Sequence, residues 1–301
     1  MRHLLNVVRG FLMGSADVVP GVSGGTVALV LGIYERLVAS IHAGSAALGY
    51  GLRLRFADAR RRLGDVEWSL LVPLLIGIGI AVLSLAALID RLLEEQPQNT
   101  AAVFFGLVLG SIVVAWQLVK RWDATRILSG LASAAVAFLL LGLRGDLVID
   151  PGLGLFLGAG AIAIVAMILP GISGSFILLM LGMYQAVLDA VNDRDLVVVG
   201  VFLIGAVTGL AAFSTLLHRL LRDHHETVIA ALIGLMLGSL RVLWPWPDGT
   251  ETAALSRPVD WGIPALLAFA GLAVVLLIGW LASRRPATDR RPATSDRRSA
   301  G

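Results

Sequence analysis

Two Pro-Gly turns, set inside apolar sequence, hold the residues of this chain that could bind an anion. Proline removes a backbone donor and glycine admits backbone angles that other residues resist, so each turn breaks a helix. The next helix then starts with unpaired N–H groups at the positive end of its dipole, and these attract a phosphate. The candidate phosphate-binding residues are Pro20, Gly21, Ser23, Gly24, Gly25 and Thr26 in the first turn and Pro170, Gly171, Ser173, Gly174 and Ser175 in the second.

The two turns belong to a longer repeat. Residues 18–38 and 168–188 share eight identities at a constant offset of 150. The pattern Gly-Leu-x-Leu-Gly-Ser also occurs twice, at an offset of 128. The smaller offset predicts a 22-residue insertion in the first half, which we place in the arginine-rich residues 43–68.

The composition indicates an integral membrane protein. The 301 residues are 57% hydrophobic and only 15% charged, which is more apolar surface than a globular core of this size buries. There is no cysteine, which excludes disulfides, thiolate metal sites and a cysteine nucleophile. The basic residues are nearly all arginines that lie between or after apolar runs, so they indicate membrane orientation and not a nucleic-acid partner.

The elements that position the turns are two helical hairpins. In the first, residues 3–16 form one arm, Val18 to Gly25 the tip, and Thr26 to Ile41 the second arm. The second hairpin occupies residues 153–190, with a helix that starts near Phe176. An arm of sixteen residues reaches about 24 Å against a hydrocarbon core of about 30 Å, so both hairpins are expected to be re-entrant. Single crossings are predicted at about 70–93, 101–119, 126–143, 196–217, 227–243 and 261–283.

These elements predict an all-α membrane protein made of two inverted repeats, each a re-entrant hairpin plus three spans. The first repeat is residues 1–147, with a cytoplasmic insertion at 43–68, the second is 148–283, and residues 284–301 form a disordered cytoplasmic tail. Each half has an odd number of crossings, so the second half is inverted. One side then holds 18 basic residues and the other five, which predicts that both termini are cytoplasmic. The insertion is either a basic amphipathic segment on an anionic leaflet or a solvated loop.

The other glycines and the histidines are interpreted as structural or surface residues and not as parts of a functional site. Pairs of glycines four residues apart predict close packing of helices. These pairs are Gly106 and Gly110, Gly154 and Gly158, Gly205 and Gly209, and Gly234 and Gly238. The histidines lie near predicted interfaces without the spacing of metal ligands, and we interpret them as ordinary surface residues, with no metal site and no cofactor. They are His3, His42, His218, His224 and His225.

A further set of residues is predicted to take part in coupling or gating. Asp17 lies three residues before Pro20, and its counterpart in the second half is Met167, so the fold does not require an acid there. A carboxylate within a membrane is a candidate for proton or cation coupling. Alternatively, Asp17 accepts hydrogen bonds from the open N–H groups of the turn, and the sequence leaves both interpretations standing. The other candidates are Tyr34, Glu35, Arg36 and Tyr184.

The stretch from Met13 to Thr26, continued by Gly32 to Glu35, resembles the signature of the bacterial polyprenyl-phosphate (undecaprenyl phosphate) translocase family, PopT. The similarity covers residues 1 to about 283, and the arginine-rich insertion and the tail lie outside the family pattern. It implies a multi-pass protein of the bacterial inner membrane that returns undecaprenyl phosphate from the outer to the inner leaflet for lipid-carrier recycling in cell-wall synthesis. The implied partners are the polyprenyl phosphate lipid, anionic membrane lipids and a coupling proton or cation.

Two other functions use similar turns. Undecaprenyl-pyrophosphate phosphatases carry a Pro-Gly-x-Ser-Arg-Ser motif, but this chain has Gly24 and Gly174 in place of the arginine, so we expect no enzyme and no catalytic residues. A small-anion channel or carrier would use the same turns without an opening toward the lipid. The sequence favours the lipid-phosphate translocase and does not exclude the small-anion carrier.

Overall fold

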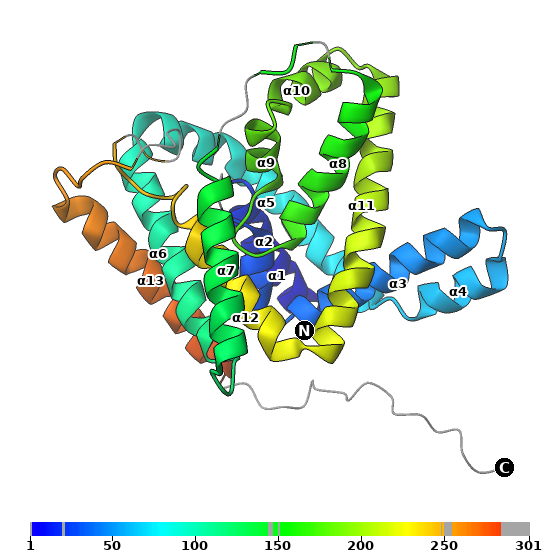
Figure 1. Ribbon diagram of the computed structural model, residues 1–301, viewed down its shortest axis with the longest axis horizontal. Helices are drawn as coiled ribbons and strands as arrows, with labels where there is room; N and C mark the ends of the chain where they lie inside the picture. The colour runs from blue at the N-terminus through cyan, green and yellow to red at the C-terminus, as the bar shows by residue number, and fades with distance from the viewer. Residues whose placement is uncertain are drawn as a thin grey trace.

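The computed structural model describes residues 2–19, 22–143, 147–149, 151–247, 249 and 255–283. Over these residues the chain forms thirteen helices and no strand (Figure 1). The helices of the first half are α1 (Arg2–Asp17), α2 (Gly24–Val30), α3 (Tyr34–Leu52), α4 (Phe56–Gly64), α5 (Trp68–Glu95), α6 (Pro97–Trp116) and α7 (Ala124–Leu140). Those of the second half are α8 (Leu153–Ile168), α9 (Gly174–Met180), α10 (Tyr184–Asn192), α11 (Leu196–Asp223), α12 (His225–Ser239) and α13 (Gly262–Ser283). The predicted tail, residues 284–301, lies outside the described residues.

Among the described residues, four helices are long and apolar enough to cross a membrane: α5, α6, α11 and α13. The pair α9 and α10 is bent by 111° and counts as a fifth apolar element. Helices α7 and α12, expected as spans at 126–143 and 227–243, have 17 and 15 residues and are shorter than predicted. Large apolar side chains such as Leu83, which is 90% exposed, cover the outside of the long helices and suit contact with lipid. The protein is therefore a multi-pass, all-helical membrane protein.

The long helices α5 and α11 each pack closely on a shorter helix through a glycine. A Cβ on Gly77 of α5 would lie 2.0 Å from the carbonyl oxygen of Val7 in α1, and one on Gly205 of α11 would lie 2.0 Å from that of Leu157 in α8. Gly77 and Gly205 are separated by the repeat offset of 128, and Val7 and Leu157 by the repeat offset of 150. The two halves therefore build the same contact, and only glycine lets the backbones approach so closely.

In two other helix pairs, a helix from the first half packs on a helix from the second half. Helix α6 packs on α13 and α12 packs on α7, so each half supplies one helix to the other. Gly106 of α6 lies against the backbone of Ala268, and Gly234 of α12 lies against that of Gly130. Close packing is confirmed for these glycines and for Gly110, Gly209 and Gly238, but Gly154 and Gly158 have open space around them, so the prediction for that pair is wrong.

Each hairpin has a second arm that is broken in two, and the prediction of one helix over 26–41 is wrong. Helix α2 ends at Val30 and α3 starts at Tyr34, because Gly32 adopts a φ of +66°. The N–H of Ile33 donates to the carbonyl of Ala28, which closes a Schellman motif. Gly182, with a φ of +67°, separates α9 from α10 in the same way. A residue with a free choice of φ thus ends the short helix behind each tip.

The arginine-rich insertion is helical. Residues 43–52 extend α3, and α4 runs back from Phe56 to Gly64, so the extra chain forms a helical hairpin that projects beside α11 (Figure 1). The turn between the two helices contains Leu54 at a φ of 58°. Of the two interpretations of this segment, a basic amphipathic segment or a solvated loop, the loop is wrong, because most of the residues belong to two helices.

Candidate functional site

The first tip supplies acceptors for its own helix start. Pro20 and Gly21 lie outside the described residues, and Ser23 is the N-cap of α2. The N–H of Gly24 donates to Asp17 Oδ1 at 2.6 Å, and the N–H of Gly25 donates to Ser23 Oγ at 3.1 Å. The first-turn donors therefore already have acceptors within the chain, and α2 begins at Gly24, two residues before the predicted Thr26.

Asp17 occupies the position where an external anion was expected. Its side chain lies so close to α2 that a Cβ on Gly24 would come within 2.5 Å of Asp17 Oδ2. A carboxylate there is stabilised by the N–H groups that an anion would use. This contact is the one expected if Asp17 caps the turn, and it means that a phosphate at this helix start would compete with Asp17.

The first tip meets the end of α8 and the second tip. Ser23 Oγ donates to the carbonyl oxygen of Met167 at 3.2 Å, and Tyr34 Oη donates to that of Ile168 at 3.2 Å. The N–H of Gly171 donates to Thr26 Oγ1 at 2.9 Å. Ser23, Thr26 and Tyr34 are almost fully buried. Polar groups of the first turn therefore satisfy carbonyl and amide groups that the break after α8 leaves open.

The second tip is built differently. The N-cap Ser173 makes no side-chain cap, and its Oγ lies 2.8 Å from that of Ser175, which is exposed. A Cβ on Gly174 would meet the side chain of Met167 at 2.6 Å, so a thioether stands where the first tip has the carboxylate of Asp17. Helix α9 begins at Gly174, two residues before the predicted start near Phe176.

The glycine and the proline of the second turn lie in the break that follows α8. Gly171 has a φ of +86°, and a Cβ on it would come within 2.8 Å of the backbone of Met236 in α12. Pro170 is fully buried beside it. Helices α2 and α9 each have seven residues, so their dipoles are smaller than those expected for long arms. Individual N–H and hydroxyl donors are therefore the groups that could hold an anion.

The remaining candidates for coupling or gating make other contacts. Glu35 Oε1 lies 2.7 Å from His225 Nε2 on α12, and Arg36 forms two hydrogen bonds with Glu67. Tyr34 is 2% exposed, whereas Tyr184 is 36% exposed. The repeated tyrosines therefore do not have equivalent surroundings, and the structure brings only Tyr34 to the contact between the tips.

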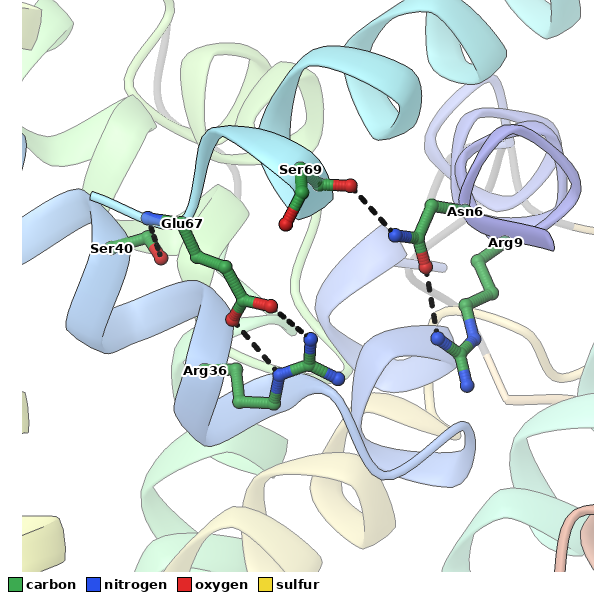
Figure 2. A network of polar contacts seen from close by, with 6 residues as sticks. All are labelled: Asn6, Arg9, Arg36, Ser40, Glu67 and Ser69. Atoms are coloured by element: carbon green, nitrogen blue, oxygen red, sulfur yellow. Dashed lines mark hydrogen bonds and ion pairs between the residues drawn. The ribbon is translucent and has the colours of Figure 1, made fainter. Parts of the chain in front are cut away.

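A polar network joins α1, α3 and the start of α5 (Figure 2). Besides the pair of Arg36 with Glu67, the N–H of Glu67 donates to Ser40 Oγ at 3.3 Å, and Asn6 Nδ2 donates to the carbonyl oxygen of Ser69 at 2.9 Å. Arg9 in turn donates to Asn6 Oδ1. This network was not predicted from the sequence, and the residue types alone carry no signal for it, because the partners are 31 and 63 residues apart.

Comparison with known proteins identifies the family of the chain. Residues 13–258 match a family described as undecaprenyl phosphate translocase-like. A polyprenyl-phosphate transporter of Vibrio cholerae serotype O1 is 37% identical, over 92% of this chain and 96% of that protein. A polyprenyl-phosphate transporter of Staphylococcus aureus is 31% identical, over 91% of this chain and 95% of that protein. No solved structure matches the chain. A match of this extent to the family and to both relatives shows that the chain belongs to the undecaprenyl phosphate translocase-like family.

Proposed function

We propose that this protein transports polyprenyl phosphate across a membrane. The observation that carries the proposal is the similarity to two polyprenyl-phosphate transporters over more than nine tenths of each chain. The four long apolar helices agree with it, since a transporter of a lipid must itself lie in the bilayer.

The phosphate head group binds, in this proposal, at the two tips and first at the second one. A phosphate in hydrocarbon needs several donors to replace its water. Gly174 and the hydroxyls of Ser173 and Ser175 offer donors without a competing carboxylate, because Met167 replaces the acid of the first tip. The exposed Ser175 gives this tip an approach from outside, whereas Ser23 and Thr26 are buried and already hydrogen-bonded.

The two halves are inverted relative to each other in this proposal, with both hairpins re-entrant and both termini in the cytoplasm. The reciprocal exchange of helices supports it, because a two-fold relation generates matching contacts such as α6 with α13 and α12 with α7. The arginine asymmetry supports the orientation. The transporter then lies in the bacterial inner membrane and moves undecaprenyl phosphate from the outer to the inner leaflet for carrier recycling in cell-wall synthesis.

In this proposal, Asp17 couples transport of the lipid to movement of a proton. When phosphate reaches the first tip it repels the carboxylate, which then takes up a proton. The contact of Asp17 with the N–H of Gly24 supports this role, since the same donor serves either the carboxylate or the phosphate. An inward proton movement would then accompany the inward movement of the lipid.

The test is transfer of labelled undecaprenyl phosphate in proteoliposomes. A phosphatase added outside the vesicles measures how much labelled lipid is accessible in the outer leaflet, and release of phosphate without added phosphatase is measured in parallel. We expect leaflet transfer without phosphate release, and transfer at least tenfold slower in a chain with Ser173→Ala and Ser175→Ala, which remove two donors to a charged group. The control is Ser84→Ala, whose hydroxyl donates only to carbonyls of its own helix.

Three results contradict the proposal. Release of phosphate by the protein alone indicates a phosphatase. Passage of labelled inorganic phosphate without lipid transfer indicates a small-anion carrier. Equal transfer rates for the double serine variant and the Ser84→Ala control show that the second tip does not bind the phosphate.

A further inference from the structure

A cluster of basic and hydroxyl side chains lies where α3 crosses α11, between the two halves of the chain. The rings of His42 and His218 stack with centroids 4.8 Å apart and an angle of 13° between their planes. His42 Nδ1 lies 3.1 Å from Thr215 Oγ1, and Ser45 Oγ lies 3.3 Å from Ser214 Oγ. We call these five residues the histidine cluster. Its two histidines are partly exposed and in mutual contact, and this contact adds to their interpretation as surface residues.

The cluster gathers positive charge. The pKa of His42 lies below its usual value, first because burial disfavours the charged ring and then because His218, Arg62 and Arg219 repel a proton there. Arg62 comes from α4 and also pairs with Asp65 at 3.5 Å, while Arg219 comes from α11. These are the titratable and charged groups that act on His42 from the helices packed around it. A bound anion would offset the repulsion and favour protonation of the ring.

The fold does not require these side chains. The repeat offsets of 150 for α3 and 128 for α11 give the corresponding positions on α10 and α5. These positions hold Asn192 opposite His42, and Ala86, Ala87 and Asp90 opposite Ser214, Thr215 and His218, whereas Ser45 lies in the insertion and has no counterpart. The corresponding positions therefore carry neither a histidine nor a hydroxyl.

We propose that the histidine cluster is a second binding site for a phosphate monoester, distinct from the two tips, which receives the head group at one end of its path. This inference rests on the proposed function for its biological ligand. A phosphate dianion accepts hydrogen bonds from protonated histidine and from a guanidinium of Arg62 or Arg219, while the hydroxyls of Thr215 and Ser214 donate to the carbonyl oxygen of Ala211 and hold the rings in place. The inverted orientation places the histidine cluster on the cytoplasmic side, where the lipid would be released.

The site can be tested by ligand titration of the purified full chain in nanodiscs. The probes are inorganic phosphate, farnesyl phosphate as a soluble prenyl monoester, farnesol as the same tail without phosphate, and phosphatidylglycerol as a phosphodiester. The readouts are the dissociation constant and the chemical shifts of isotope-labelled histidine rings as a function of pH. We expect both monoesters to raise the pKa of His42, and the double variant His42→Gln, His218→Gln to bind them at least tenfold more weakly.

Matched variants make the outcome specific. His224→Gln removes an exposed histidine outside the cluster and should bind as the native chain does. The variant with Ser173→Ala and Ser175→Ala alters only the second tip, and its histidine signals should still respond to phosphate. Thermal unfolding of the double histidine variant checks that it is folded, and the single variant His218→Gln, which keeps the ring of His42, provides the same test if it is not.

Several results overturn the inference. Histidine signals that do not respond to either monoester, or equal affinities of the double histidine variant and His224→Gln, show that the stacked rings only fill a helix crossing. Equal responses to farnesol or to phosphatidylglycerol show a tail site or a diester site instead. A response to inorganic phosphate in a chain that fails to transfer polyprenyl phosphate supports the site while refuting the proposed function.

Discussion

The hydrogen bond from the N–H of Gly171 to Thr26 Oγ1 is expected to hold the two tips together, and the substitution Thr26→Val tests it. Valine has nearly the shape of threonine but has no oxygen to accept the bond. Both partners are buried, and the N–H of Gly171 has no second acceptor among the hydrogen bonds of the described residues. The variant therefore leaves a buried donor unpaired.

The expected loss in the free energy of unfolding follows from that single unpaired donor. An unsatisfied buried group costs about 1–3 kcal/mol, which lowers the folded-to-unfolded ratio by a factor of roughly 5 to 150. Thr26→Ser keeps the acceptor and loses only a methyl group, at a cost of about 0.8 kcal/mol. Thr208→Val removes a hydroxyl that donates to carbonyls of its own helix on an exposed face, and should change stability by less than about 0.5 kcal/mol.

The assay is reversible unfolding in mixed micelles of dodecyl maltoside and dodecyl sulfate, followed by circular dichroism. We expect the order of stability to be native, Thr208→Val, Thr26→Ser and then Thr26→Val. If Thr26→Val unfolds at the same detergent fraction as Thr26→Ser, the bond between the tips contributes nothing and the reasoning is refuted.

Three further predictions concern packing, coupling and topology. Gly77→Ala should destabilise the chain by about 1–3 kcal/mol, because the new Cβ would clash with the backbone of α1, whereas Gly79→Ala, with open space around it, should not; equal unfolding curves would contradict the packing. Asp17→Asn should make lipid transfer insensitive to an imposed proton gradient, and a response equal to that of the native chain would assign Asp17 to capping alone. Single cysteines at Gln98 and Asp58 should react with impermeant reagents from opposite sides of the membrane, and labelling from one side would exclude the inverted arrangement.

The tips could be located from sequence because their chemistry is local. Proline and glycine break a helix wherever they stand, and the same break occurred twice at a fixed offset. The Schellman turn was also readable, since Gly32 and Gly182 stand at the same place in the repeat, but the prediction of one helix over 26–41 left out the helix end that Gly32 imposes.

Contacts between distant residues could not be found in this way. Neither the pairing of Arg36 with Glu67 nor the stacking of His42 on His218 leaves a pattern in the sequence, because each depends on how helices cross. The acceptors of the first tip are a similar case: the Asp17 carboxylate was a candidate from its position, but the donation from Ser23 to Met167 required the end of α8 to be in place. The sequence therefore predicted the donors of the candidate site better than their partners.

The exchange of helices between the halves has a consequence for synthesis of the chain. Gly106 of α6 leaves the ribosome about 160 residues before Ala268 of α13, its packing partner. At roughly 5–20 residues per second, α6 waits on the order of 10–30 s in the membrane with its glycine face covered only by lipid. During that interval the face is open to unrelated helices. Insertion of α13, almost the last described part of the chain, is then the step that commits both halves to the native fold.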